Sequence, residues 1–328
     1  MSGTAMLQVG DQFDHFQIQG HIAQGGMSDI YRAFDLLTGK DVVLKIPDRL
    51  SIGDPAQYER FQREVEVMKT LQHPAILKGL GSGRFNSTPY LVTELVEGES
   101  MRDMVKRLAP MPVVESVALI KKIADGIAHC HDHEIIHRDL KPENILIAGN
   151  GQPVVLDFGL ALTKKSYRVT YANLSSTAGT PDYMAPEQIE GHRGDVRTDV
   201  YAVGTMLYEL LTGRTPFSGD SNLAIMAQHL TAAIPRLDKE QTNVSPQLAA
   251  VVARSLQRDP SDRYADMHAL VHDLDHLDGV DITILDRVSS PSKMKALWRS
   301  PILRTVGSTL LLIAVIILLA FVLKSIHS

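Results

Sequence analysis

A short stretch from His137 to Asn144 concentrates side chains that could carry out phosphoryl transfer. It reads HRDLKPEN, so an acid (Asp139), a base (Lys141) and an amide (Asn144) stand close together, and a second acid, Asp157, follows. One carboxylate can orient a hydroxyl group, a cation can neutralise charge on a moving phosphoryl group, and the remaining oxygens can hold a hard metal ion. Because these groups must act on one reacting centre, we expect them to lie close in space.

The residues before Gly98 are expected to form mainly strands. Phe16, Ile18 and Ile22 fall on alternate positions, which is typical of a strand with one buried face. By the same criteria we expect strands at 15–22, 30–34, 41–46, 76–81 and 90–94. One helix is expected at 55–71, and its apolar face carries Phe61, Val65, Met68 and Leu71.

After Gly98 the pattern changes to long helices. The strongest helical pattern runs from 113 to 131, and its apolar face predicts a core helix. That face consists of Val117, Ile120, Ile123, Ala124, Ile127 and Ala128. The change in pattern indicates a boundary between a small strand-rich lobe and a larger helical lobe.

The motifs resemble those of the eukaryotic-type Ser/Thr protein kinases. In that family the catalytic loop reads H-R-D-x-K-P-x-N and a metal-binding turn reads D-F-G, which stands here at 157–159. A lysine-bearing strand (41–46) and a segment ending in A-P-E (179–187) occur in the family's order. The resemblance covers about Phe16 to Leu277. It implies an α+β, two-lobed fold with a small antiparallel-sheet N-lobe and a large helical C-lobe, and the use of ATP and Mg²⁺.

The resemblance also implies a role for each polar residue of the catalytic loop. Asp139 resembles the catalytic base that orients the substrate hydroxyl, and Lys141 would neutralise charge on the transferring phosphoryl group. Asn144 and Asp157 would hold Mg²⁺. We expect Glu143 to contact a basic residue of a peptide substrate.

Lys45, in the strand 41–46, resembles the family's ATP-binding lysine. A lysine in an apolar strand needs an anionic partner, and the family supplies the α- and β-phosphates of ATP together with a helix carboxylate. Glu64 and Glu66 are both available on the helix 55–71. The distance to the following His73-Pro74 resembles the family's and favours Glu64, whereas Glu66 is better explained as a solvated charge on the helix surface.

Further residues are expected around ATP by resemblance and order. A small-residue turn between the first two strands could approach phosphates closely, although Ala23 and Ser28 replace the outer glycines of the usual loop. Val43 stands where the family usually has Ala over adenine, which predicts a tighter pocket. The complete set is Ala23, Gln24, Gly25, Gly26, Ile30, Val43, Lys45, Glu64, the gatekeeper Thr93, the hinge residues Glu94 and Val96, and Leu146 beneath adenine.

The stretch 160–185 is rich in hydroxyl groups and is expected to act as an activation loop. Arg138 would bind a phosphate there and so order the loop around it, and phosphorylation is expected to occur between two copies of the chain. A plain flexible loop is the alternative. The candidate acceptors are Ser166, Thr170, Ser175, Ser176 and Thr177.

Two further residues are expected to support the site without taking part in the chemistry. Asp199 would anchor the catalytic loop backbone from a buried helix, and Arg263 would pair with Glu187. The segment 179–187 resembles a platform for peptides, which disfavours a small-molecule kinase.

Composition and cysteine content argue against nucleic-acid-binding, disulfide-bonded, zinc-binding and secreted proteins. The chain has 328 residues, 44% of them hydrophobic, and a formal net charge of −5, which gives no indication of nucleic-acid binding. Its single cysteine, Cys130, cannot form an intramolecular disulfide and suits a reducing, cytoplasmic compartment. The cluster from His129 to His133 contains zinc-type ligands, but its spacing matches no standard structural zinc site. No signal peptide is expected at the N-terminus.

The C-terminal part predicts a membrane anchor. Residues 305–323 carry no charge and are almost wholly apolar, long enough to cross the hydrocarbon core of a bilayer. Basic residues precede this segment and only Lys324 follows it, which places the kinase on the cytoplasmic side of the cell membrane as a single-pass protein. No extracellular sensor domain is expected. Small residues near Thr305 form no G-x-x-x-G motif, so the sequence does not decide whether two such helices dimerise in the membrane.

The predicted organisation is a flexible N-terminus (1–14), a kinase catalytic domain (15–277), a juxtamembrane linker (278–304), a transmembrane helix (305–323) and a short tail (324–328). The predicted function is a membrane-tethered kinase that phosphorylates Ser/Thr hydroxyls of proteins, with a homodimer for phosphorylation in trans. The alternative is a pseudokinase-like scaffold, which Ala23 and Val43 favour. Against it, Lys45, Asp139 and Asp157 are all present.

Overall fold

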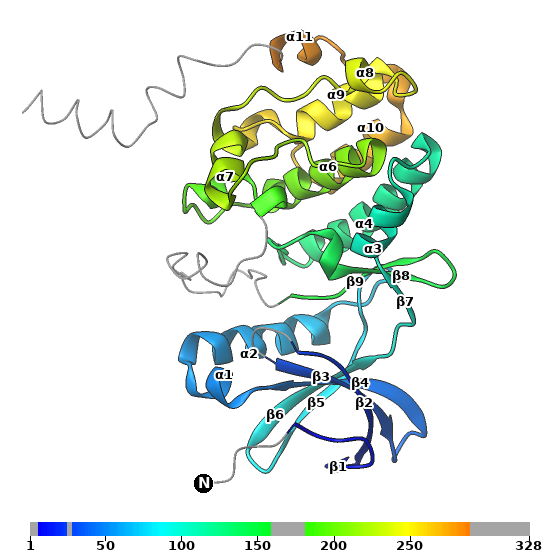
Figure 1. The fold of residues 1–328 in the computed structure, drawn as a ribbon, viewed down its shortest axis with the longest axis vertical. Coiled ribbons are helices and arrows are strands. Elements are labelled where there is room, and N and C mark those ends of the chain that lie inside the picture. Colours follow the sequence, from blue (N-terminus) through cyan, green and yellow to red (C-terminus); the bar gives the residue numbers. More distant parts are fainter. Residues whose placement is uncertain (1–5, 25–27, 159–180, 289–328) are drawn as a thin grey trace, which may run out of the picture.

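The computed structural model describes residues 6–24, 28–158 and 181–288, which form two lobes (Figure 1). The small lobe contains a six-stranded antiparallel sheet in the order β1-β2-β3-β4-β6-β5. Its strands are β1 (Gln12–Phe13), β2 (Phe16–Gln24), β3 (Ser28–Asp35), β4 (Lys40–Pro47), β5 (Gly79–Phe85) and β6 (Thr88–Glu94).

Alternating side chains divide this sheet into two faces. On β4, Val42 and Leu44 are buried in the core of the small lobe, where they join Phe16 and Ile18 of β2. Because successive side chains of a strand point to opposite faces, Val43 and Lys45 lie on the other face. The sheet therefore directs Lys45 away from the core.

Helices α1 (Arg49–Gly53) and α2 (Pro55–Thr70) lie beside the sheet (Figure 1). Asp54 caps α2, because its carboxylate accepts hydrogen bonds from the backbone N–H groups of Ala56 and Gln57, and Pro55 suits the first turn. The helix predicted at 55–71 is confirmed. Its predicted apolar residues Phe61, Val65, Met68 and Leu71 are buried.

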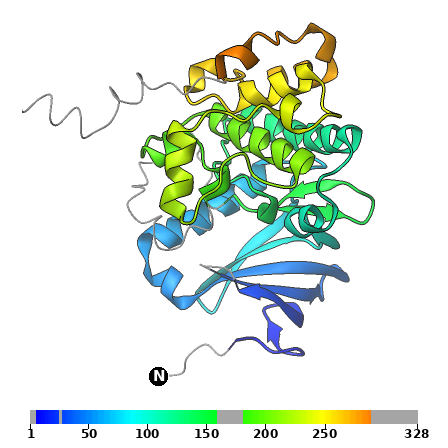
Figure 2. The ribbon, with the colours of Figure 1, turned by 45° about the horizontal axis from the view of Figure 1, so that its top comes forward.

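The larger lobe is mainly helical (Figure 2). Its centre is formed by α4 and α6, which pack against each other; α6 is almost wholly buried, and α4 buries one face. The helices are α3 (Met101–Leu108), α4 (Val113–Asp132), α5 (Pro186–Ile189), α6 (Val196–Thr212), α7 (Asn222–Thr231), α8 (Leu237–Glu240), α9 (Pro246–Ser255), α10 (Met267–Asp275) and α11 (Ile284–Val288), with 3₁₀ turns η1 (Pro142–Asn144), η3 (Pro181–Tyr183), η4 (Pro260–Asp262) and η5 (Leu277–Gly279).

A three-stranded sheet lies on the side of the larger lobe that faces the small lobe (Figure 1). It consists of β7 (Gly98–Ser100), β8 (Ile145–Ala148) and β9 (Pro153–Val155), which pair in the order β7-β8-β9. The loop between α4 and β8 contains the HRDLKPEN stretch. The catalytic loop is thereby held between a core helix and a small sheet.

The connection between α2 and β5 is bonded to the larger lobe. The backbone N–H of Val155 donates to the carbonyl of Ala75 at 2.9 Å, and the backbone N–H of Leu77 donates to the carbonyl of Val155 at 2.9 Å. Gly126 of α4 faces Ala75 so closely that an added Cβ would lie 2.9 Å from the Cβ of Ala75. The last turn of α2 is thus followed directly by a segment fixed to α4 and β9.

The packed structure continues beyond Leu277, because Leu285 of α11 is buried in the core of the larger lobe. Among the residues that the structure describes, no helix is long and apolar enough to cross a membrane. The span predicted at 305–323, its linker after residue 288 and the tail lie outside the described residues.

Candidate active site

Lys45 forms the predicted ion pair with Glu64. Its Nζ atom lies 2.7 Å from each carboxylate oxygen of Glu64 and 3.9 Å from Oδ1 of Asp157. Burial would lower the pKa of Lys45, but the carboxylates of Asp157 and Glu64 outweigh it and hold that pKa above its ordinary value. Glu66 instead pairs with Lys69 on the exposed side of α2, so the choice of Glu64 over Glu66 is confirmed.

The catalytic loop gathers three of the polar residues that the sequence singled out. Lys141 Nζ donates to Oδ2 of Asp139 at 2.8 Å, and Asn144 Nδ2 donates to the same oxygen at 3.0 Å and to the Asp139 carbonyl at 2.7 Å. The side chain of Asp139 is 34% exposed, so it remains within reach of a substrate. The backbone N–H of Leu156 donates to the Asn144 carbonyl, which ties the loop to the segment carrying Asp157.

Asp199 of α6 holds the backbone of this loop, as predicted. Its Oδ2 accepts from the backbone N–H of His137 at 2.9 Å, and its Oδ1 accepts from that of Arg138 at 2.8 Å. Its Oδ2 also lies 2.9 Å from Nε2 of His131. Arg138 has a φ of 70°, which a non-glycine residue rarely adopts without such support. Burial alone would raise the pKa of Asp199, but the hydrogen bonds from His131 and the loop hold it below its ordinary value.

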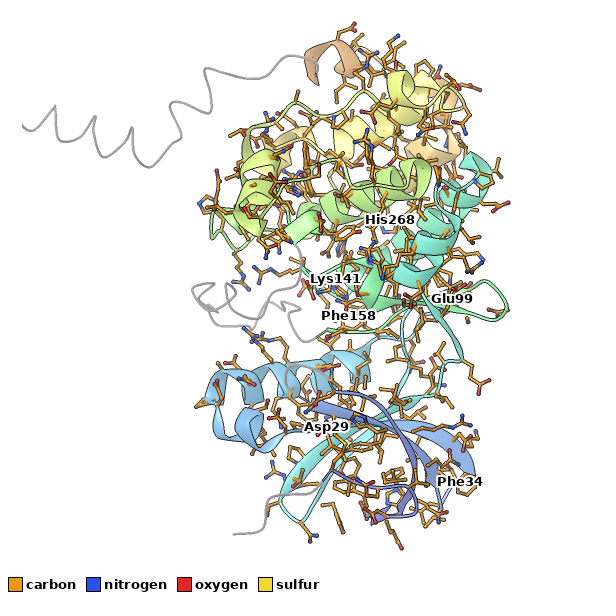
Figure 3. All side chains as sticks on the ribbon, viewed as in Figure 1. Asp29, Phe34, Glu99, Lys141, Phe158 and His268 are labelled. Carbon is orange, nitrogen blue, oxygen red and sulfur yellow. The ribbon has the colours of Figure 1, made fainter. Side chains whose placement is uncertain are left out.

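Two aromatic rings connect the loop to the segment with the second acid. His137 and Phe158 are both fully buried, and their ring centroids lie 4.9 Å apart. Figure 3 shows Phe158 and Lys141 at the level where the two lobes meet. Phe158 adjoins Asp157 in the chain, so this packing fixes Asp157 near the catalytic loop. Sequence reasoning had assigned no role to the Phe158 ring.

The residues expected around ATP lie on neighbouring strands of the small lobe. In the register of the sheet, Ile30 stands opposite both Ala23 and Lys45, and Val43 stands opposite Thr93. These strands therefore bring most of the predicted nucleotide side chains to one region. Gln24, at the end of β2, is exposed, and Gly25 and Gly26 lie outside the described residues.

The remaining predicted ATP contacts come from the connection between the lobes and from β8. Glu94 ends β6, and its backbone N–H donates to the Lys78 carbonyl at 3.0 Å while its Oε1 accepts from the Lys78 N–H. Val96 follows in the connection to β7 and is half-buried. Leu146 stands between Ser100 and Val154 in the sheet of the larger lobe.

The A-P-E segment is anchored by the predicted ion pair of Glu187 and Arg263. The two guanidinium nitrogens of Arg263 lie 2.6 and 2.8 Å from the two carboxylate oxygens, and Thr198 Oγ1 also donates to Glu187 at 2.8 Å. Burial would raise the pKa of Glu187, but Arg263 holds it below its ordinary value. Of the expected platform at 179–187, residues 181–187 are described. All five candidate phosphorylation sites lie outside the described residues.

Next to the catalytic loop, the larger lobe contains a cavity of about 750 Å³ that includes Lys141 in its lining. Glu143 lies in this lining, but its Oε1 accepts from Nε of Arg102 at 2.7 Å. One oxygen of Glu143, which was expected to contact a basic residue of a substrate, is thus already bonded inside the protein, while the side chain stays 47% exposed. Sequence reasoning missed Arg102 altogether, because a single arginine in the first turn of a helix carries no pattern that marks it.

The donor set fits a magnesium ion that is shared with phosphates. Asn144 and Asp157 offer hard oxygen atoms, and the Asp157 carboxylate is 45% exposed. Mg²⁺ usually takes one or two protein carboxylates and completes its shell with phosphate and water oxygens, so two protein donors suffice. Among the described residues, no three His, Cys, Asp or Glu side chains are placed to hold a metal ion together. In the His129 to His133 cluster, Cys130 is buried in the core and His131 contacts Asp199.

The comparisons with known proteins agree with this geometry. Residues 16–274 match the protein kinase domain family. This chain belongs to that family. Among its relatives, the serine/threonine-protein kinase PknL of Mycobacterium tuberculosis is 39% identical over 263 residues, which cover 79% of this chain and 65% of PknL. The probable serine/threonine-protein kinase PknB of Lactococcus lactis is 35% identical over 82% of this chain and 43% of PknB.

The kinase domain of PknI from Mycobacterium tuberculosis has the same fold. Its crystal structure superposes with a TM-score of 0.65 at 23% identity and covers 84% of this chain and all of that domain. The predicted two-lobed kinase fold and the resemblance to bacterial Ser/Thr kinases are confirmed. The chain spans 65% of PknL and less than half of PknB, so it matches only part of these relatives.

Proposed function

We propose that this chain is a membrane-tethered serine/threonine protein kinase that transfers the γ-phosphoryl group of ATP to hydroxyl groups of proteins. The observation that carries the proposal is the assembled set of Asp139, Lys141 and Asn144, together with the formed pair of Lys45 and Glu64. The relatives named as serine/threonine-protein kinases support it.

Each residue of the set has a role that its position allows. Asp139 accepts the proton of the substrate hydroxyl or orients that hydroxyl for attack. Lys141, bonded to Asp139, places a positive charge where the transferring phosphoryl group would pass. Lys45 stays protonated beside Glu64 and Asp157 and would bind the α- and β-phosphates. Asn144 and Asp157 would hold Mg²⁺, which neutralises charge on the phosphates.

The face of the small sheet that carries Val43 and Lys45 is proposed to cover the nucleotide. Ala23, Gln24, Gly25 and Gly26 would approach the phosphates, and Thr93, Glu94 and Val96 would border the adenine from the strand β6 and the connection after it. Leu146 would close the adenine site from the larger lobe, with Ile30 and Val43 opposite. The sheet registers that bring Ile30, Lys45, Val43 and Thr93 together support this placement.

Autophosphorylation of the 160–185 stretch is part of the proposal. Arg138 is mostly buried, and burial lowers its pKa to about 10, so it stays charged at neutral pH. Asp199 favours the charge of Arg138, whereas the nearby cations Arg193 and Arg63 oppose it. A phosphate close to these arginines would relieve this repulsion and gain charge-assisted hydrogen bonds. Phosphorylation in trans would take place within a homodimer.

The apolar stretch 305–323 is proposed to tether the kinase to the cell membrane as a single-pass helix. Its length suits a bilayer, and four basic residues stand shortly before it, which favours a cytoplasmic kinase domain. These basic residues are Lys293, Lys295, Arg299 and Arg304.

The proposal is tested with the full chain in detergent, labelled MgATP and a generic protein substrate. We expect label on Ser or Thr, and we expect Asp139→Asn to lower the rate by about 10²- to 10⁴-fold, because the group that orients the hydroxyl is lost. Asp132→Asn is the matched control, since this exposed acid lies on α4 of the same lobe. Equal rates for Asp139→Asn and wild type would refute the role of Asp139. Nucleotide binding without any transfer would favour a scaffold.

A further inference from the structure

The cavity beside Lys141 is placed to receive a side chain of a protein substrate. Lys141 lies in its lining and bonds to Asp139, so a residue in the cavity would be near the hydroxyl that Asp139 orients. Its walls come from α3, η1, η3 and α6 of the larger lobe. Three acids line it, Glu143, Asp182 and Glu209, and acids of this kind commonly bind arginine or lysine.

Two of these three acids are already occupied by Arg102. Its Nε donates to Glu143 at 2.7 Å and its Nη1 donates to Glu209 at 2.7 Å. Its Nη2 contacts the hydroxyl of Tyr183, which also contacts the second oxygen of Glu209. The side chain of Arg102 is 19% exposed and that of Glu209 is 7% exposed, so this network is largely withdrawn from water.

The third acid, Asp182, does not offer a substitute binding site for a basic side chain. Asp182 is next to Tyr183 in η3, and its carboxylate accepts from Thr215 Oγ1 at 3.4 Å. Burial raises the pKa of Asp182, which means that the site disfavours its charged form. Two further cations line the cavity, Lys106 and Arg214, whose side chains are 69% and 60% exposed.

A basic substrate residue would therefore meet a site that already contains its own cation. To reach Glu209 and the bonded oxygen of Glu143 it would have to displace Arg102, and a buried charge that loses its partners is strongly disfavoured. Lys106 and Arg214 are exposed and paired with Asp103 and Glu240, so they add only weak repulsion of the same sign. Like charges at a recognition site discriminate against a partner as effectively as missing contacts do.

We propose that Arg102 is a specificity-determining residue that occupies the position a basic substrate side chain would take. The chain then phosphorylates Ser or Thr in segments without arginine or lysine beside the acceptor. This inference rests on the proposed kinase activity. It differs from the expectation that Glu143 binds a basic residue of the substrate, because here the carboxylate is used inside the protein.

The test measures kcat/KM of the full chain in detergent for three peptides of one fixed sequence around a central Ser. They differ only in the three residues before the Ser, which are all Arg, all Gln or all Glu. For wild type we expect the Gln and Glu peptides to be used at least about threefold better than the Arg peptide. In Arg102→Gln we expect the Arg peptide to become preferred by about tenfold, because Glu143 and Glu209 are released to bind it.

Lys106→Gln is the matched control. It removes one positive charge from the same cavity, but Lys106 contacts neither Glu143 nor Glu209 and pairs only weakly with Asp103 at 3.9 Å. Its peptide preference should stay within about threefold of wild type. Equal shifts in Arg102→Gln and Lys106→Gln would show a general charge effect and overturn the proposal. A wild-type preference for the Arg peptide would overturn it as well.

A second variant keeps the test decisive where Arg102→Gln does not fold. Glu143 is 47% exposed, and Glu143→Gln in the presence of Arg102 should leave the ratio of Arg to Gln peptide unchanged. If Glu143 bound substrate arginine directly, this variant would lower kcat/KM for the Arg peptide alone, which contradicts our assignment. Failure of the kinase activity itself looks different, since no peptide would be labelled and Asp139→Asn would equal wild type.

Discussion

Replacing Asp199 by Asn should disable the catalytic loop without touching any reacting group. The carboxylate is fully buried, and its two oxygens accept the backbone N–H groups of His137 and Arg138 together with the ring N–H of His131. Asparagine has the same size but only one acceptor oxygen. Whichever way the amide turns, its NH₂ group faces at least one backbone N–H of the loop.

The cost follows from this lost acceptor. A buried N–H without a partner costs about 1–3 kcal/mol, and the loss of a charged acceptor places the value toward the upper end. The bond to Arg138 supports its φ of 70°, so the loop is expected to relax there. Asp139 is the next residue, and a displacement of about 1 Å at a reacting group can lower the rate by about 10²-fold.

The assay compares kcat for phosphoryl transfer and the free energy of unfolding in the full chain in detergent. Asp195→Asn is the matched control, because Asp195 caps the same helix from an exposed position and asparagine caps equally well. We expect a loss of about 10²-fold in kcat and about 2 kcal/mol in stability for Asp199→Asn only. Wild-type kcat in a variant that has lost this stability would refute the reasoning, since the loop would then be held by other contacts.

Two further variants test buried polar groups of the larger lobe. Arg263→Met should lower the free energy of unfolding by about 3–5 kcal/mol, because it leaves Glu187 buried without its cation. Arg214→Met is the control and should lower the free energy of unfolding by less than about 1 kcal/mol, since the Arg214 side chain is 60% exposed. Equal losses of stability in Arg263→Met and Arg214→Met would contradict this prediction. His229 is buried against Tyr201, and burial lowers its pKa to about 4. Between pH 4 and pH 6.5 the unfolded chain therefore binds more protons than the folded chain. The free energy of unfolding falls as the pH is lowered through this range. This loss of stability amounts to about 3 kcal/mol. It should disappear from the pH profile of unfolding in His229→Gln. An unchanged profile would show that His229 does not titrate in this way.

Long-range contacts of the site could be predicted where a motif specified both partners. The pairs of Lys45 with Glu64 and of Arg263 with Glu187 followed from the order of the motifs, and the structure forms both. The helix predicted at 113–131 is α4, because its apolar residues repeat with the period of a helix over many turns. Strong periodicity and charged residues in fixed order were therefore sufficient for the main elements.

Predictions that depended on local backbone detail were less accurate. Ile22 was expected on the buried face of the first strand, but it is 52% exposed, because irregularities in the pairing of β2 with β3 shift the register before it. The strand expected at 76–81 begins at Gly79, because Ile76 pairs with Val155 of the larger lobe instead. Tertiary contacts decided both outcomes, and a single sequence does not display them.

The bonds between Ala75, Leu77 and Val155 attach the C-terminal end of α2 to the larger lobe. The last turn of this helix leads into a segment fixed to the larger lobe, whereas Lys45 belongs to the sheet of the small lobe. Because α2 also packs against β5 of that sheet, the separation of Lys45 from Glu64 depends on how the helix is held between the sheet and the larger lobe. A change in the orientation of the two lobes would therefore act on the ion pair of Lys45 and Glu64 while the packed interior of each lobe stays unchanged.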